Sequence, residues 1–183
     1  MNETEIIEKY FETPEEKRHI LRSYLTDSLD SVEDVLKVVE LGIGGKYTNS
    51  GKTAIDLLTE ISNPKLFKES FLIYIGKAET DKLAYEILLY AIASALKISE
   101  MDKFNLVSEI LQHNIVQHNI EGAWAKLIVI DILESLGDKI ALPLIKKCLE
   151  LLTKDKEDCV ASYAKIAHGN VIISAFLDGR ATL

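Results

Sequence analysis

The chain has 183 residues, 48% of them hydrophobic and 27% charged, a composition that is typical of a folded globular protein and excludes a disordered one. Its formal net charge of −8 disfavours binding to a nucleic-acid backbone, and no stripe of Lys and Arg with interleaved aromatic residues offsets that charge. With only 3 Pro and 9 Gly, the chain has fewer turn signals than a β-rich domain of this length needs, so we expect an all-α protein.

The acidic excess lies mainly at the start of the chain, where residues 1–40 contain 11 acidic and 5 basic residues. Within this segment Thr13, followed by Pro and two Glu, predicts a helix start with a hydroxyl cap. The helix after it is expected to carry on one stripe Ile20, Leu21, Tyr24 and Leu25. An acidic surface on these helices either improves solubility or attracts a basic partner and raises its association rate.

Two helix starts flank the only long loop that we expect. Ser31 and Asp34 resemble a capping box, which predicts a helix over 32–42. Three glycines and several small polar residues then predict a loop over 43–52. Asn63-Pro64 predicts a further helix start, because Asn caps well and Pro is tolerated at the first helical position.

Amphipathic helices alternate with more apolar ones along the rest of the chain. Helices are predicted over 54–61, 64–76, 80–98, 102–117, 121–136, 139–152, 155–167 and 171–177. The clearest hairpin has Gly137, which favours the left-handed conformation that ends a helix, and Pro143 in the first turn of the next helix. We therefore expect one all-helical domain over 1–183, with N-terminal helices over 1–62 and helical hairpins over 63–183.

The segment 121–169 carries a pattern that recurs along the chain. Its first helix contains Leu142-Pro143-Leu144-Ile145 and Leu149, and its second contains Asp155, Val160, Ala164, Ala167 and Gly169. The same register fits, one unit earlier, Ile128, Ile132, Ser135 and Gly137, and a fainter version ends at Ala95-Leu96-Lys97. This pattern resembles HEAT-type repeats, and armadillo repeats more loosely, with Ala161 where the HEAT pattern usually has Arg. The resemblance implies an α-α superhelix, a right-handed stack of about nine or ten helices whose inner helices line a concave binding surface.

Two of the predicted inner helices carry the residues that we single out as partner contacts. These residues are Glu86, Tyr90, Trp124 and Asp131. Aromatic side chains flanked by charges are typical of the residues that dominate protein–protein binding energies. The structural alternative is that Tyr90 and Trp124 are core residues and that Asp131 is an internal cap.

The loop over 43–53 offers an alternative site for an anion. It resembles a phosphate-binding loop, but five residues separate Gly45 from Gly51 where that motif has four, and no β-strand is predicted before it. The residues that would hold an anion at the start of the next helix are Lys46, Lys52 and Thr53.

The remaining reactive side chains do not form a recognisable catalytic or metal-binding pattern. His113 and His118 are five residues apart, which places them on different faces of a helix, so we expect no metal site. Cys148 and Cys159 are too few for a disulfide framework, and we expect both to be buried free thiols. We expect no enzyme activity and no cofactor.

Sequence features also bear on the compartment. No charged segment followed by an apolar core opens the chain, and the longest apolar run, Leu127 to Ile130, is too short to span a bilayer. We therefore expect a cytoplasmic protein that does not bind membranes.

These features together favour a non-catalytic protein-binding module with a basic partner. Small size and acidic charge point more specifically to an inhibitor of a basic protein, such as the immunity partner of a nuclease toxin. The alternative is a protein that binds a phosphate-bearing or nucleotide ligand through the loop over 43–53.

Overall fold

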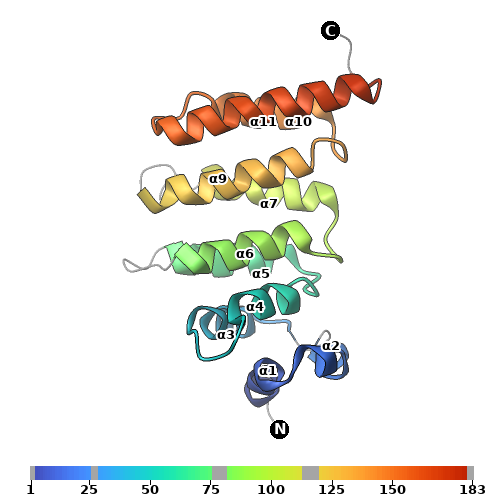
Figure 1. The fold of residues 1–183 in the computed structure, drawn as a ribbon, viewed down its shortest axis with the longest axis vertical. Coiled ribbons are helices and arrows are strands. Elements are labelled where there is room, and N and C mark those ends of the chain that lie inside the picture. Colours follow the sequence, from blue (N-terminus) through green and yellow to red (C-terminus); the bar gives the residue numbers. More distant parts are fainter. Residues whose placement is uncertain (1–2, 26–28, 76–81, 113–119, 181–183) are drawn as a thin grey trace. The chain divides into compact units, whose positions relative to one another are not determined.

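The computed structural model describes residues 3–25, 29–75, 82–112 and 120–180 (Figure 1). Over these ranges it contains ten α-helices, one 3-10 helix and no strand, which confirms the all-α prediction. The chain forms two compact units, Met1–Ser99 and Glu100–Leu183. The expected boundary between residues 62 and 63 lies inside the first unit, so the division into N-terminal helices and hairpin repeats stays a prediction.

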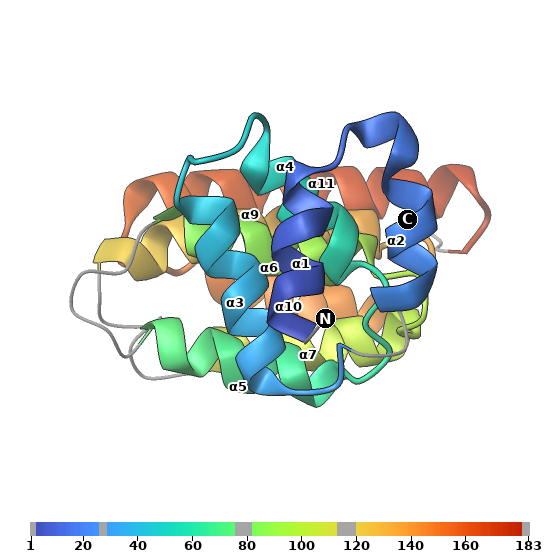
Figure 2. The same cartoon turned by 90° about the horizontal axis from the view of Figure 1, so that it is seen from below.

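The first unit contains six α-helices in its described residues. They are α1 (Glu3–Glu12), α2 (Arg18–Leu25), α3 (Val32–Ile43), α4 (Ser50–Leu58), α5 (Pro64–Ile75) and α6 (Lys82–Ser94), with a 3-10 helix η1 (Glu15–Lys17) before α2. Helix α3 packs against α1, α4, α5 and α6, and α4 also packs against α6 (Figure 2). The rings of Phe71 and Tyr85, both almost fully buried, have centroids 5.4 Å apart and join α5 to α6.

The second unit contains four described helices: α7 (Glu100–Gln112), α9 (Ile120–Ser135), α10 (Leu142–Leu152) and α11 (Asp158–Leu177). Helix α9 packs against α7, α10 and α11, and α10 packs against α11. Small residues on the buried side of α11, among them Ala164, Ala167 and Ala175, let its backbone approach its neighbours closely. A core of aliphatic residues therefore forms between these helices.

Three helix-start predictions are confirmed. The Asp34 backbone N–H donates to the Ser31 hydroxyl at 3.2 Å, as a capping box requires. The Lys65 N–H donates to the Asn63 side chain at 3.1 Å before α5. Pro143 lies in the first turn of α10. Each of these signals is local, because the capping groups and the helix they start are within a few residues of one another.

The prediction that the Thr13 hydroxyl caps the start of a helix is wrong. The Thr13 hydroxyl donates to the Lys9 carbonyl at 2.7 Å, so it closes α1, a helix for which we named no signal. The turn that follows is the 3-10 helix η1, which has no side-chain cap. Of the expected apolar stripe on α2 only Leu25 is buried, whereas Ile20 and Tyr24 are largely exposed.

Two glycines serve close packing and not a left-handed backbone. Among the described glycines only Gly45 and Gly179 have positive φ, so the expected left-handed conformation at Gly137 is wrong. A Cβ atom at Gly137 would lie 3.0 Å from a methyl of Val171 on α11. At Gly42, which lies inside α3, a Cβ atom would lie 2.7 Å from both Ala54 on α4 and Ile87 on α6.

Helix α11 is longer than the sequence pattern indicates. We expected one helix to end at 167 and another to begin at 171, but α11 is continuous through Gly169. Glycine in a helix interior costs roughly 1 kcal/mol relative to alanine, and packing of α11 against α9 and α10 outweighs that cost. The predicted helix end at 117, the stop at Gly76 and both His113 and His118 lie outside the described residues.

A buried ion pair links two helical segments of the second unit. The Lys126 ammonium on α9 lies 2.7 Å from the Asp155 carboxylate, and the two side chains are 2% and 8% exposed. Asp155 also accepts the Glu157 backbone N–H at 3.0 Å, just before α11. Its carboxylate therefore contacts the backbone just before α11 while it pairs with Lys126.

The cysteine prediction is correct only in that both thiols are free. Cys148 on α10 is half-buried, with its sulfur 3.8 Å from the Ser108 hydroxyl. Cys159 lies in the first turn of α11 and is exposed, so its predicted burial is wrong.

Candidate protein-binding surface

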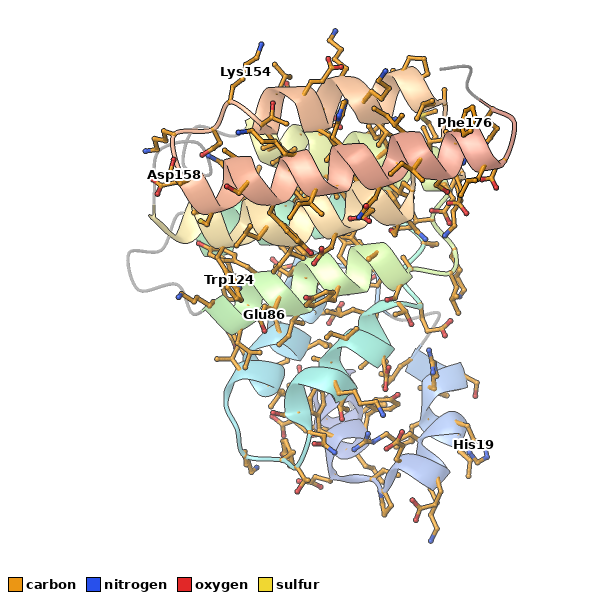
Figure 3. All side chains as sticks on the ribbon, turned by 45° about the horizontal axis from the view of Figure 1, so that its top comes forward. His19, Glu86, Trp124, Lys154, Asp158 and Phe176 are labelled. Carbon is orange, nitrogen blue, oxygen red and sulfur yellow. The ribbon has the colours of Figure 1, made fainter. Side chains whose placement is uncertain are left out.

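The four predicted partner contacts divide between the two units. Glu86 and Tyr90 lie on α6, and Trp124 and Asp131 lie on α9. The side chains of Tyr90 and Trp124 are 40% and 39% exposed, so the alternative that they are core residues is wrong. Figure 3 shows Glu86 and Trp124 on their respective helices. Glu86 and Tyr90 therefore belong to the first unit, and Trp124 and Asp131 belong to the second.

Asp131 joins α9 to α11. It is exposed, and its carboxylate accepts a hydrogen bond from the Tyr163 hydroxyl of α11, so it is not an internal cap of α9. About one turn further along α9 and two turns further along α11, the Asn170 amide of α11 donates to the Glu134 carboxylate at 2.9 Å. Because both contacts advance along α9 and α11 together, the two helices run in the same direction.

These contacts join Asp131 and Glu134 on α9 to Tyr163 and Asn170 on α11. Together with Trp124, which lies seven residues before Asp131 on the same face of α9, they form a surface that we call the α9/α11 face. It combines two partly exposed aromatic rings with two carboxylates. Each carboxylate accepts one hydrogen bond from α11. The carboxylates of such a face can pair with cationic groups of a partner, and its aromatic rings can pack against apolar parts of the partner's surface.

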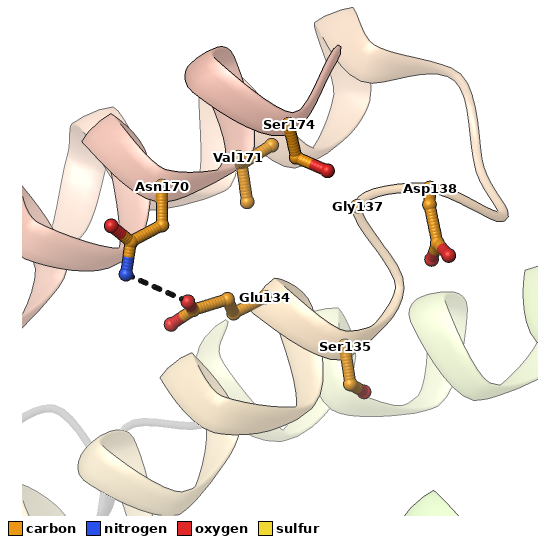
Figure 4. Close-up of a pocket in the computed structure, with 7 residues that line it drawn as sticks. All are labelled: Glu134, Ser135, Gly137, Asp138, Asn170, Val171 and Ser174. Atoms are coloured by element: carbon orange, nitrogen blue, oxygen red, sulfur yellow. Dashed lines mark hydrogen bonds between the residues drawn. The ribbon is translucent and has the colours of Figure 1, made fainter. Parts of the chain in front are cut away.

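A pocket lies at the end of this face, between the C-terminal end of α9 and α11 (Figure 4). Its volume is about 330 Å³, and its lining comprises Glu134, Ser135, Gly137, Asp138, Asn170, Val171 and Ser174. Two carboxylates, two hydroxyls and one amide line it, and the Arg180 guanidinium donates to the carbonyl of Gly137 at 2.8 Å. Gly137 packs closely against Val171, because a Cβ atom there would lie 3.0 Å from a Val171 methyl. The pocket has the charge and size to accept the end of a Lys or Arg side chain.

The residues of the predicted anion site lie in three different environments. Lys52 pairs with Glu15 at 3.1 Å, and the Lys46 ammonium lies 4.9 Å from the centre of the Tyr47 ring. Thr53 is 1% exposed, and its buried hydroxyl has no hydrogen-bond partner. The loop itself is shorter than expected, because α3 extends to Ile43 and α4 begins at Ser50. No contact observed here favours anion binding, which stays a prediction.

Sequence reasoning missed the contribution of α11 to this surface. Glu134, Tyr163 and Asn170 were not named, although Tyr163 and Asn170 are seven residues apart and fall on one helical face. The expected break at Gly169 hid this periodicity, because it divided the segment into two short helices.

Two further observations concern metal binding and membrane spanning in the described part of the chain. No group of three or more His, Cys, Asp or Glu side chains within it is arranged to hold a metal ion. One described helix, α11, is long and apolar enough to cross a membrane by length and composition alone, and 28% of its most apolar window is buried.

Comparisons with known proteins do not assign the chain to a group. No family model matches it, and no curated protein or solved structure matches it either.

Proposed function

We propose that this chain is a non-catalytic protein-binding module and that its α9/α11 face binds a basic protein. One observation carries the proposal: the Asp131 and Glu134 carboxylates of α9 are each hydrogen-bonded to α11, Asp131 to the partly exposed Tyr163, and the partly exposed Trp124 lies about two turns before Asp131 on the same face of α9. This combination of negative charge and aromatic area suits recognition of cationic side chains.

The packing of alternate helices supports a HEAT-like repeat architecture as part of the same proposal. In the second unit α9 packs on α11, with α10 against both. In the first unit α4 packs on α6 and α3 packs on α5, so the pairing of each helix with the next but one recurs there. Repeats of this kind bury a continuous core between hairpins and leave the inner helices available for partners.

Charge explains why a basic partner is favoured over a neutral one. The net charge of the chain is −8, and residues 1–40 carry the largest share of the excess. The negative electrostatic field of the chain attracts cationic proteins and raises their association rate. The contacts at the α9/α11 face determine their dissociation rate. Inhibition of a basic enzyme, such as a nuclease toxin, is the specific role that this charge and the small size of the chain support.

Cross-linking from the face tests the proposal. A photo-reactive amino acid replaces Trp124, the cross-linked protein is identified by mass spectrometry, and its binding is then measured with both proteins purified. We expect one basic protein, bound at least tenfold more weakly by Asp131→Asn combined with Glu134→Gln.

The matched control for charge is Glu69→Gln, which removes an exposed carboxylate from α5 in the other unit. It should leave the affinity within twofold of the wild type. A purified partner that is acidic, or one whose affinity falls equally with the control, would contradict the proposal.

A further inference from the structure

Exposed side chains on α11 follow the spacing of a helix–helix seam. At alternating intervals of four and three residues the positions are Cys159, Tyr163, Ile166, Asn170, Ile173 and Leu177, and all six are exposed. Ile166 and Ile173 are each 59% exposed and Leu177 is 76% exposed. This 3.5-residue repeat is the pattern by which one α-helix packs along another.

The seam is long enough for a partner helix of about five turns. From Cys159 to Leu177 it spans 18 residues, or roughly 27 Å at 1.5 Å per residue. Figure 3 shows Asp158 and Phe176 towards the two ends of the helix. Asn170 interrupts the apolar positions near the middle, and a polar residue there specifies register in paired helices.

Charged side chains lie along both edges of the seam, and the α9 edge carries only carboxylates among those that contact α11 in the described residues. On the α9 side, Asp131 contacts Tyr163 and Glu134 contacts Asn170, so carboxylates lie along that edge. On the α10 side, His168 of α11 faces Glu150 at 3.5 Å. The exposed residue on α11 next to that contact is Lys165. The apolar seam is therefore bordered by Asp131 and Glu134 on the α9 side, and by Glu150, His168 and Lys165 on the α10 side.

We infer that the seam on α11 binds an amphipathic α-helix of the partner, with that helix's basic flank against Asp131 and Glu134. This inference rests on the proposed function and names the structural element that the partner supplies. The apolar residues of the partner helix pack between Ile166, Ile173 and Leu177. A Lys or Arg at the end of its basic flank enters the pocket lined by Glu134 and Asp138.

Charge complementarity favours a basic helix over two other possible occupants of the seam, a second copy of this chain and an anionic lipid surface. Two copies joined through α11 would bring two sets of Asp131 and Glu134 carboxylates to one interface, so a second copy is less complementary than a basic helix. An anionic lipid surface would be repelled by Asp131 and Glu134. The apolar composition of α11 alone does not distinguish these occupants, and the acids beside it do.

A designed peptide tests the inference with the full chain. The peptide has 21 residues, Leu at 3.5-residue spacing and Lys along one flank, and its control has the same composition in scrambled order. Fluorescence anisotropy measures binding, and circular dichroism measures whether the peptide becomes helical. We expect saturable binding of the patterned peptide only, with a gain in helix.

Variants locate the site. Ile166→Ser combined with Ile173→Ser should weaken peptide binding at least tenfold. The matched control is Ile20→Ser, since Ile20 is 64% exposed on α2 and lies in the other unit. It should leave the affinity unchanged. Equal binding of the scrambled peptide, no binding of either peptide, or binding without a gain in helix would overturn the inference.

Two more outcomes separate this inference from the proposed function. If the purified partner depends on Asp131 and Glu134 but binds the Ile166/Ile173 variant normally, the inference is wrong and the proposed function stands. If the chain sediments with phosphatidylserine vesicles through Ile166 and Ile173 and ignores the peptide, α11 is a membrane-binding element and the inference is overturned.

Discussion

The Lys126 ammonium on α9 and the Asp155 carboxylate before α11 form an ion pair of 2.7 Å that is almost closed to water. Replacement of one member leaves the other charge buried without its partner, which costs about 3–5 kcal/mol. We expect Lys126→Met to lower the free energy of unfolding by that amount in urea titration. Lys126→Met with Asp155→Leu should recover a large part of the loss, and a double variant as unstable as the sum of both singles would show that the pair is not coupled.

Two glycines should respond to alanine in opposite directions. A Cβ atom at Gly42 would lie 2.7 Å from Ala54 and from Ile87, so Gly42→Ala should destabilise the first unit by about 1–3 kcal/mol through overpacking. At Gly169 no atom outside the adjoining backbone of α11 and the two neighbouring residues lies within 4 Å of the added carbon, and Gly169→Ala should stabilise α11 by roughly 0.5–1 kcal/mol. Thermal unfolding of the two variants measures both signs. A stabilising Gly42→Ala would refute the close approach of α3 and its neighbours.

The contrast between these positions shows what the sequence could predict. The caps at Ser31 and Asn63 were predicted correctly, because donor and acceptor lie within three residues. The role of Gly137 depends on Val171, which is 34 residues away in the chain, so local reasoning assigned it a left-handed turn that does not exist. The periodicity of apolar residues predicts that a helix forms. It does not predict whether packing against other helices will outweigh the energetic cost of a glycine within that helix.

The same limit applies to the candidate site. Trp124 and Asp131 were predicted because an aromatic ring and a carboxylate share one face of an apolar helix. Tyr163 and Asn170 were missed, because their relation to α9 arises only when α11 packs beside it. Lys52 and Thr53 look like a ligand pair in sequence, but Lys52 reaches Glu15 and Thr53 is buried.

Loss of the Ser31 cap should cost more than loss of the Thr13 hydroxyl. The Ser31 oxygen accepts an N–H at the start of α3, so Ser31→Ala should lower the free energy of unfolding by about 1 kcal/mol. The Thr13 hydroxyl is exposed and donates to a carbonyl at the end of α1, where water replaces it readily. Denaturant titration of both variants provides the comparison. A larger effect for Thr13→Ala would contradict the assignment of Ser31 to the start of α3 and of Thr13 to the end of α1.

Buried tyrosines should make the protein sensitive to alkali. Burial raises the pKa of Tyr74 well above its ordinary value of 10.0, and burial also raises the pKa of Tyr10. The unfolded chain therefore loses these protons at lower pH than the folded one. The stabilisation is complete below pH 10 and is lost as the pH rises from there towards the folded-state values.

The variant that tests this pH dependence is Tyr74→Phe. It removes a hydroxyl that donates to the Leu36 carbonyl at 3.3 Å, so the free energy of unfolding at neutral pH should fall by about 1 kcal/mol. Between pH 9 and pH 11 its stability should then fall less steeply than that of the wild type. Tyr24→Phe, at an exposed position, is the control and should retain the wild-type slope. Parallel slopes for the wild type and Tyr74→Phe would contradict the assignment to Tyr74.

Calorimetric titration of the purified basic partner into the wild type and into Trp124→Ala tests the central claim most directly. We predict that Trp124→Ala weakens binding at least tenfold, as loss of an aromatic contact that dominates an interface does, while Tyr24→Ala on α2 leaves the affinity within twofold. Unchanged affinity for Trp124→Ala, with full affinity also retained by Asp131→Asn, would place the binding surface elsewhere on the chain.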